Sequence, residues 1–144
     1  MKLYFETIVS GSVKEVFFKF DKELFLQLKP PGVTVDLKRF DGCNKGDEIQ
    51  LELKSPAGTQ EWKGIVTDSF VSEDECYFVD EGVKLPFPLT HWSHRHTIKN
   101  IKGKTTIIDD ISFEISPKIM TPVFYPILWS VFKYRGPIYR RIFK

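Results

Sequence analysis

The feature of the sequence that most constrains the fold is a row of short segments with alternating apolar residues and little chain between them. Ile49, Leu51 and Leu53 illustrate the pattern, which is typical of a strand with one buried face. Asp41-Gly42 and Pro56-Ala57-Gly58 supply turn residues between neighbouring segments. A crossover between parallel strands needs about a dozen residues or more, and the gaps here are shorter. The pattern therefore predicts an antiparallel meander of strands at residues 33–37, 49–53, 62–71, 76–80, 91–101 and 105–115.

The chain before this meander predicts one more strand and two short helices. The first ten residues alternate as a strand. Ser12 and Glu15 have the spacing of a capping box, in which each side chain satisfies the other's end of the first helical turn. Asp21 is expected to cap a second helix, and Pro30-Pro31 to end it.

The meander is followed by a long amphipathic helix. Thr121 is the expected N-cap, and Pro122 the first helical residue. Gly136-Pro137 is expected to stop or kink the helix, with residues 137–143 as a continuation. The apolar stripe of this helix consists of Val123, Phe124, Ile127, Leu128, Val131 and Phe132.

The order of these elements predicts an α+β fold. A curved antiparallel sheet of six to seven strands would grip the long C-terminal helix, with two short helices after the first strand. We expect residues 1–144 to form a single domain. One helix cannot close a curved sheet completely, so aromatic side chains plug the gap or a cavity remains. Phe, Tyr and Trp make up 15% of the chain, which is enough for either outcome.

Composition and charge argue against several classes of protein. The two cysteines are too few for a disulfide framework and lack metal-binding spacing. The sequence has neither the apolar run of a signal peptide nor that of a transmembrane helix, so we expect a cytoplasmic protein without stable membrane insertion. The six basic residues after Glu114 are confined to the helical end, which argues against nucleic acid. They either face an anionic partner or membrane surface, or are solvated and favour the helix dipole.

Four short segments carry a resemblance to a known superfamily. They are residues 25–30 (FLQLKP), 39–42 (RFDG) with 46–47 (GD), 92–98 (WSHRHTI) and Tyr134-Arg135. In these segments the chain resembles the START/SRPBCC superfamily, with the helix-grip fold of the birch-pollen-allergen type, and its small bacterial ligand-binding members in particular. The resemblance implies a deep pocket between sheet and helix for lipids, sterols, polyketides or aromatic metabolites. Some members are cyclases or dehydratases and others are chaperone activators, so the resemblance implies no fixed set of catalytic residues.

The densest group of polar residues is the set of three histidines within residues 91–96. Alternation puts His94 and His96 on the inner face of their strand, and Asp109 on the inner face of the next. A register that keeps inner residues opposite each other places His96 opposite Asp109, with Cβ atoms about 5 Å apart, so we expect the two side chains within direct or water-bridged hydrogen-bonding reach. The same register pairs Ile98 with Ile107, His94 with Ile111 and Arg95 with Asp110.

Three interpretations of His96 and Asp109 remain open. The two groups satisfy each other in a closed core, or anchor the polar head of a ligand, or act as a catalytic acid and base. We predict no metal and no other cofactor, because His94 and His96 lack a clear third ligand, with Asp109 the one candidate. Cys43 and Cys76 do not lie in electropositive surroundings, so a cysteine nucleophile is not predicted either.

The leading prediction for function is non-catalytic binding of a small hydrophobic ligand. One alternative is a cyclase- or dehydratase-like enzyme using His96 and Asp109, and another is a protein- or membrane-interaction module using the basic aromatic tail from Lys133 to Lys144. The loop Leu85–Leu89 either covers a cavity mouth or packs on the first helices. Neither the identity of the ligand nor an oligomeric state is predicted. The expected ligand-binding residues are Trp92, His94, His96, Asp109, Ile111, Phe113, Phe124, Leu128 and Phe132.

Overall fold

The computed structural model describes residues 1–30, 32–56 and 58–144. It confirms the predicted α+β architecture of an antiparallel sheet, two short helices and a long C-terminal helix. The predictions for Pro31, at the end of a helix, and for Ala57, in a turn, lie outside the described residues. In chain order the elements are β1 (Lys2–Val9), α1 (Val13–Phe18), α2 (Lys22–Gln27), β2 (Thr34–Phe40), β3 (Glu48–Ser55), β4 (Gly58–Val71), β5 (Glu75–Lys84), β6 (Leu89–Ile101), β7 (Lys104–Ile115), the 3₁₀ turn Lys118–Met120 and α3 (Thr121–Ile142).

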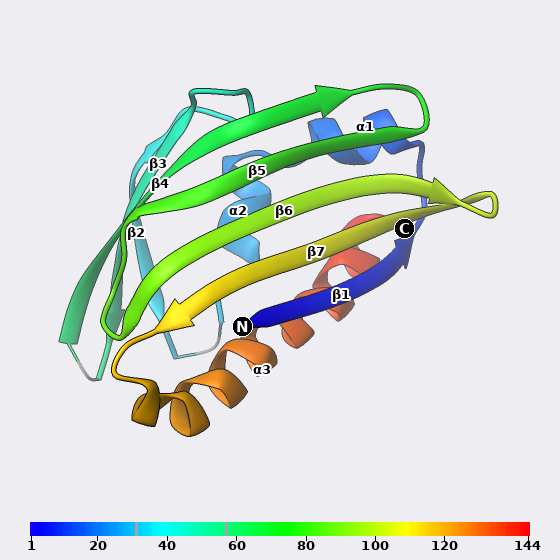
Figure 1. Ribbon diagram of the computed structural model, residues 1–144. Coiled ribbons are helices and arrows are strands. Elements are labelled where there is room, and N and C mark those ends of the chain that lie inside the picture. Colours follow the sequence, from blue (N-terminus) through cyan, green and yellow to red (C-terminus); the bar gives the residue numbers. More distant parts are fainter. Residues whose placement is uncertain (31, 57) are drawn as a thin grey trace.

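The seven strands that the structure describes form one sheet in the order β1-β7-β6-β5-β4-β3-β2. Each neighbouring pair is antiparallel, so β2 to β7 form the predicted meander. β1 pairs with β7, so the first and the last strand of the chain lie side by side in the sheet (Figure 1). The sheet is strongly curved, and the three α-helices lie on its concave side (Figure 1).

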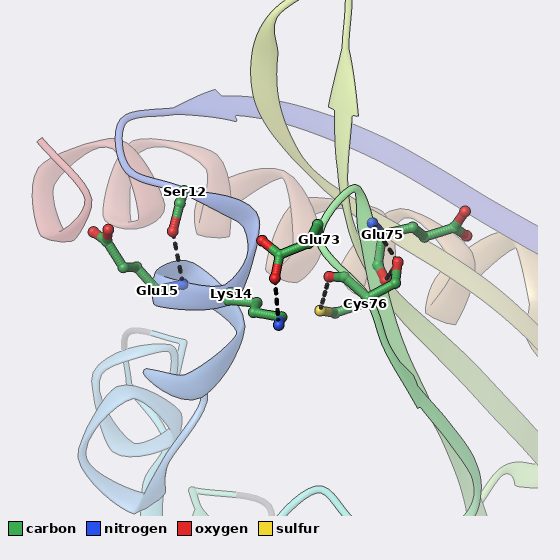
Figure 2. Close-up of polar contacts among 7 residues, drawn as sticks. Ser12, Lys14, Glu15, Glu73, Glu75 and Cys76 are labelled. Atoms are coloured by element: carbon green, nitrogen blue, oxygen red, sulfur yellow. Dashed lines mark hydrogen bonds and ion pairs between the residues drawn. The ribbon is translucent and has the colours of Figure 1, made fainter.

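Both short helices begin at their predicted N-caps. The Ser12 hydroxyl accepts a hydrogen bond from the backbone N–H of Glu15 at 3.2 Å, which is the serine half of the predicted capping box (Figure 2). The Asp21 carboxylate likewise accepts from the N–H of Leu24. An exposed ion pair of 2.6 Å between Lys14 and Glu73 then connects α1 to the turn between β4 and β5 (Figure 2).

The long helix α3 differs from the prediction at its N-terminal end. Met120 is the N-cap and Thr121 is already helical, so the prediction of Thr121 as N-cap was wrong. The 3₁₀ turn runs directly into α3, which removes the extended backbone that a capping threonine adopts. At the other end, α3 continues past Pro137 to Ile142, which agrees with the predicted continuation over residues 137–143, and Tyr139 beyond the proline is fully buried. No helix in the described part of the chain, α3 included, is long and apolar enough to cross a membrane.

Two buried apolar clusters hold the helices on the sheet. The first joins α1, α2 and the end of α3 to β5, β6 and β7. The second joins the middle of α3 to β1, β6 and β7, where the rings of Phe132 and Trp92 lie 5.7 Å apart. Every second residue of β7 from Ile107 to Ile115 is buried, as the predicted inner face requires.

Candidate functional site

A pocket of about 390 Å³ lies between the strands β2 to β6, the helix α2 and the first part of α3. The loop Pro86–Leu89 also borders this pocket, and Phe87 in the loop is largely exposed. This position is consistent with the predicted cover over a cavity mouth. The apolar lining includes Phe25, Val35, Ile49, Leu53, Trp62 and Ile127.

The structure places six of the nine predicted ligand-binding residues on the pocket wall: Trp92, His94, His96, Phe124, Leu128 and Phe132. The other three, Asp109, Ile111 and Phe113, are buried in β7 and are not among the described residues that line the pocket. The pocket thus extends away from β7, toward the curled edge of the sheet. A ligand-binding role for these residues stays a prediction.

The predicted register of β6 and β7 is confirmed, but the hydrogen bonds differ from the expected ones. His96 lies opposite Asp109, and His94 lies opposite Ile111. Nevertheless it is His94 whose Nε2 lies 2.8 Å from Oδ1 of Asp109, while Nδ1 of His96 is 3.5 Å from the same oxygen. The His96 ring stacks on Phe78 of β5, with ring centroids 4.3 Å apart, and this contact turns its Nε2 toward β5.

The residue that His96 meets on β5 is Asp80. Its Oδ2 lies 3.1 Å from Nε2 of His96. The predicted strand 76–80 ends at Asp80, where an acidic side chain is usually solvated, but β5 continues to Lys84 and the Asp80 side chain is only 22% exposed. The signal was present in the alternation of Cys76, Phe78 and Asp80, which share one face of the strand. Asp80, His94, His96 and Asp109 form what we call the polar cluster.

Helix α3 adds two polar side chains beside the polar cluster. Arg135 lines the pocket with its guanidinium 4.4 Å above the ring of Phe132, and Tyr139 is fully buried behind it. Among the described residues, Nδ1 of His96, Nε of Arg135 and the hydroxyl of Tyr139 are buried without a hydrogen-bond partner. Buried polar atoms of this kind call for an explanation, because leaving them unpaired costs about 1–3 kcal/mol each.

The electrostatics of the polar cluster favour neutral His94 beside ionised carboxylates. Burial, together with the neighbouring His96, lowers the pKa of His94 to about 4. Burial also opposes ionisation of Asp109, but the hydrogen bond from His94 and the nearby positive charge of Arg135 prevail, and its pKa is lowered to about 2. The pKa of Asp80 is lowered by the hydrogen bond from His96, against the effect of burial. With two carboxylates, one guanidinium and formally neutral histidines, the polar cluster and Arg135 carry a net formal charge of −1.

The arrangement offers three kinds of chemistry at one end of an apolar pocket. His96 with Asp80 can anchor a polar group, transfer a proton, or join His94 as metal ligands. Nucleophilic catalysis by cysteine is not supported, because burial raises the pKa of the pocket-lining Cys43 to about 12, far from a reactive thiolate.

The basic tail retains little apolar surface for a partner. Ile138, Tyr139 and Phe143 are buried, while Arg140 and Arg141 are exposed. Tyr134 is the half-exposed aromatic residue in this segment. The burial of the tail's apolar residues therefore weakens the interpretation of this segment as a membrane- or protein-binding module.

No protein-family model matches the sequence, and no curated protein matches it either. Solved structures do match. A protein from Chromobacterium violaceum has a TM-score of 0.65 at 14% identity, covering 96% of this chain and 96% of that one. The di-domain ARO/CYC StfQ from the steffimycin biosynthetic pathway has a TM-score of 0.59 at 13% identity. The match covers 93% of this chain and 44% of the StfQ chain. Truncated norcoclaurine synthase from Thalictrum flavum has a TM-score of 0.58 at 14% identity, covering 85% of this chain and 82% of that one.

Identities this low establish the fold alone. The sheet order, the two short helices after β1 and the long helix on the concave side are those of the helix-grip fold. This protein therefore has the fold of the START/SRPBCC superfamily, which confirms the resemblance found in the sequence.

Proposed function

We propose that the protein binds a small, mainly apolar molecule in the pocket, with a polar end of that molecule against the polar cluster. The observation that carries this proposal is the composition of the pocket wall. Apolar side chains from five strands and two helices enclose about 390 Å³, and the buried polar groups converge at one place on the floor. Pockets of about 300–1,000 Å³ with a few convergent polar groups are the usual form of small-molecule sites.

The neighbouring structures support the class of ligand without naming it. An ARO/CYC protein of a biosynthetic pathway and a norcoclaurine synthase have the same fold, so the fold accommodates small-molecule chemistry. Because function depends on the site and not on the fold, the support is for a lipid, polyketide or aromatic metabolite as a class.

A cyclase- or dehydratase-like reaction is the second candidate, and one observation favours it. His96 lines the pocket and contacts Asp80, so a carboxylate orients an imidazole that can reach a bound molecule. Asp109, the partner expected from the sequence, would act indirectly through its hydrogen bond with His94. Binding without turnover leads, because the pocket wall is mainly apolar and burial keeps the Cys43 thiol far from a reactive thiolate.

Native mass spectrometry of freshly purified protein tests the proposal first, because a co-purified molecule reveals the ligand class directly. Titration calorimetry with 2-naphthol, an aromatic probe with one hydroxyl group, tests the pocket itself. Leu128→Trp puts a ring into the pocket and should lower the affinity at least tenfold. Val123→Trp, on the exposed side of the same helix, is the matched control and should bind like wild type. Equal affinities in the two variants, or no apolar ligand at all, would contradict the proposal.

A further inference from the structure

We propose that His94, His96 and Asp80 bind one divalent transition-metal ion at the floor of the pocket. The three residues come from adjacent strands, and their potential ligand atoms all lie within 4.8 Å of one another. The sequence alone lacked a third ligand for the two histidines, and the structure supplies Asp80. The inference concerns a metal ion alone and does not depend on an organic ligand.

One pair of the potential ligand atoms already has the spacing of a coordination shell, and all three lie within 4.8 Å of one another. Metal–nitrogen and metal–oxygen bonds of about 2.0–2.2 Å at angles between 90° and 110° place two ligand atoms about 2.8–3.6 Å apart. Nε2 of His96 and Oδ2 of Asp80 are 3.1 Å apart, which is within that interval. The rings of His94 and His96 are stacked with centroids 3.5 Å apart, so both histidines are within reach of the same ion after small side-chain rotations.

Asp109 is placed to orient both histidines from behind. Its Oδ1 lies 2.8 Å from Nε2 of His94, so a neutral His94 that donates this hydrogen bond keeps the lone pair of its other nitrogen for a metal. The same oxygen lies 3.5 Å from Nδ1 of His96. A carboxylate behind a ligating histidine is the common arrangement at metal sites.

The unpaired Nδ1 of His96 is the independent observation that points to a ligand. When a neutral His96 donates Nε2–H to Asp80, its Nδ1 lone pair faces the Asp109 carboxylate and is buried without a partner. A metal ion on Nε2 reverses this arrangement, because the proton then occupies Nδ1 and faces Asp109. A doubly protonated His96 would satisfy the two carboxylates without any metal, and it is the alternative that the experiment separates.

The surroundings fit a cation of this class. The two carboxylates exceed the single guanidinium of Arg135 by one negative charge, which favours a cation over an anionic group. Asp80, His94 and His96 all line the pocket, which leaves the remaining coordination positions open to water or to a bound molecule. Two imidazoles and one carboxylate are donors that suit Zn²⁺ and Fe²⁺.

Titration calorimetry of tag-free, chelator-treated protein with Zn²⁺, repeated with Co²⁺ and its visible absorption as a probe, tests the proposal without any organic ligand. We expect one ion per chain and a visible Co²⁺ absorption that indicates a low coordination number. Zn²⁺ should raise the melting temperature of the protein. Asp80→Asn and His96→Ala should each weaken binding at least a hundredfold, and Asp109→Asn tenfold to a hundredfold. His91→Ala, an exposed histidine on the same strand, is the control and should bind as wild type does.

The wild-type stoichiometry decides the question even if a variant fails to fold. Absence of Zn²⁺ and Co²⁺ binding to folded wild-type protein would overturn the proposal and leave a protonated His96 as the explanation. Binding that survives both Asp80→Asn and His96→Ala, or that is lost with His91→Ala, would place the ion elsewhere and overturn it as well. Metal binding and 2-naphthol binding are measured separately, so failure of one leaves the other standing.

Discussion

The inner face of the sheet is closed at β7 and at the end of β6 that carries Ile98, and it is open at β2 and β3. In the closed half, Ile98, Ile107 and Ile111 are fully buried. In the open half, Ile49 and Leu53 follow the same alternation of apolar residues but are only half-buried, and both line the pocket. The strands of the two halves are therefore distinguished less by their pattern than by what covers them.

The cover differs because the sheet curves and the helices do not follow it. α3 packs on β1, β6 and β7 through Phe132, and α1 packs on β5, where Phe17 contacts Phe78. Toward β2 the sheet curls away, and in the described part of the chain α2, one side of α3 and the loop Pro86–Leu89 border the space that this leaves. The polar cluster lies on β5, β6 and β7, at the boundary between the closed and the open half, where buried polar groups meet accessible space.

The largest expected effect is a difference in the free energy of unfolding between one variant in the closed half and one in the open half. Ile111→Ala, in the closed half, should lower the free energy of unfolding by about 2–5 kcal/mol, because the vacated volume cannot collapse. Ile49→Ala, in the open half, should cost about 1 kcal/mol or less, because its side chain already borders empty space. Urea unfolding of both variants measures the difference. Equal losses would show that the two halves are packed alike.

The next effect concerns the thiol of Cys43, which borders the open half. Burial, together with the nearby carboxylate of Asp80, raises its pKa to about 12. At pH 8 we expect alkylation by iodoacetamide to be about a hundredfold slower than for free cysteine, because the scarce thiolate outweighs its higher nucleophilicity. The rate should still rise with pH above pH 9. Peptide mapping by mass spectrometry assigns the modified residue.

Urea-unfolded protein is the control for Cys43, and it should react at the rate of free cysteine. A folded-state rate that already levels off near pH 9 would show that water enters this part of the pocket wall freely.

A smaller effect on stability is expected from Asp109, which lies at the boundary between the closed and the open half. Asp109→Asn should cost about 1–3 kcal/mol, because the amide satisfies His94 less well than the carboxylate does. Asp110→Asn, on the outer face of the same strand, should remain within about 0.5 kcal/mol of wild type. Thermal melts measure both, and 2-naphthol affinity is measured alongside. A purely structural Asp109 predicts unchanged affinity, whereas a change would assign it a part in ligand binding.

The smallest effect is expected at the exposed edge of the closed half. Lys14→Ala removes the ion pair with Glu73 that Figure 2 shows between α1 and the β4–β5 turn. Both groups are solvated, so we expect no measurable change in melting temperature. A clear loss of stability would mean that α1 depends on this contact and not on its buried side chains.

The sequence predicted the parts of the site that follow from backbone alternation. The register of β6 and β7 was predicted correctly, because any shift by one residue would have turned Ile98 and Ile107 outward. The hydrogen-bond partners were not predicted: His94 binds Asp109, and His96 binds Asp80. This choice depends on the stacking of the His96 ring against Phe78, which the alternation of residues does not predict.

Two other differences had causes that lie outside local sequence patterns. Asp80 was not predicted as part of the site because the predicted strand ended at residue 80, whereas β5 continues to Lys84. Whether aromatic residues fill the gap beneath the helix or leave a pocket depends on how all the side chains pack together. The single-domain organisation and the cytoplasmic location stay predictions.

The most direct test of the central claim is a methyl NMR titration of the isoleucine residues with 2-naphthol. Ring currents of a bound aromatic molecule shift nearby methyl signals, so the experiment reports the location of the ligand within the sheet. We predict saturable shifts at Ile49 and Ile65, which line the pocket, and unchanged signals at Ile98, Ile107 and Ile111. Shifts of equal size in both groups, or shifts confined to the second, would contradict the division of the sheet into a closed half and an open, ligand-binding half.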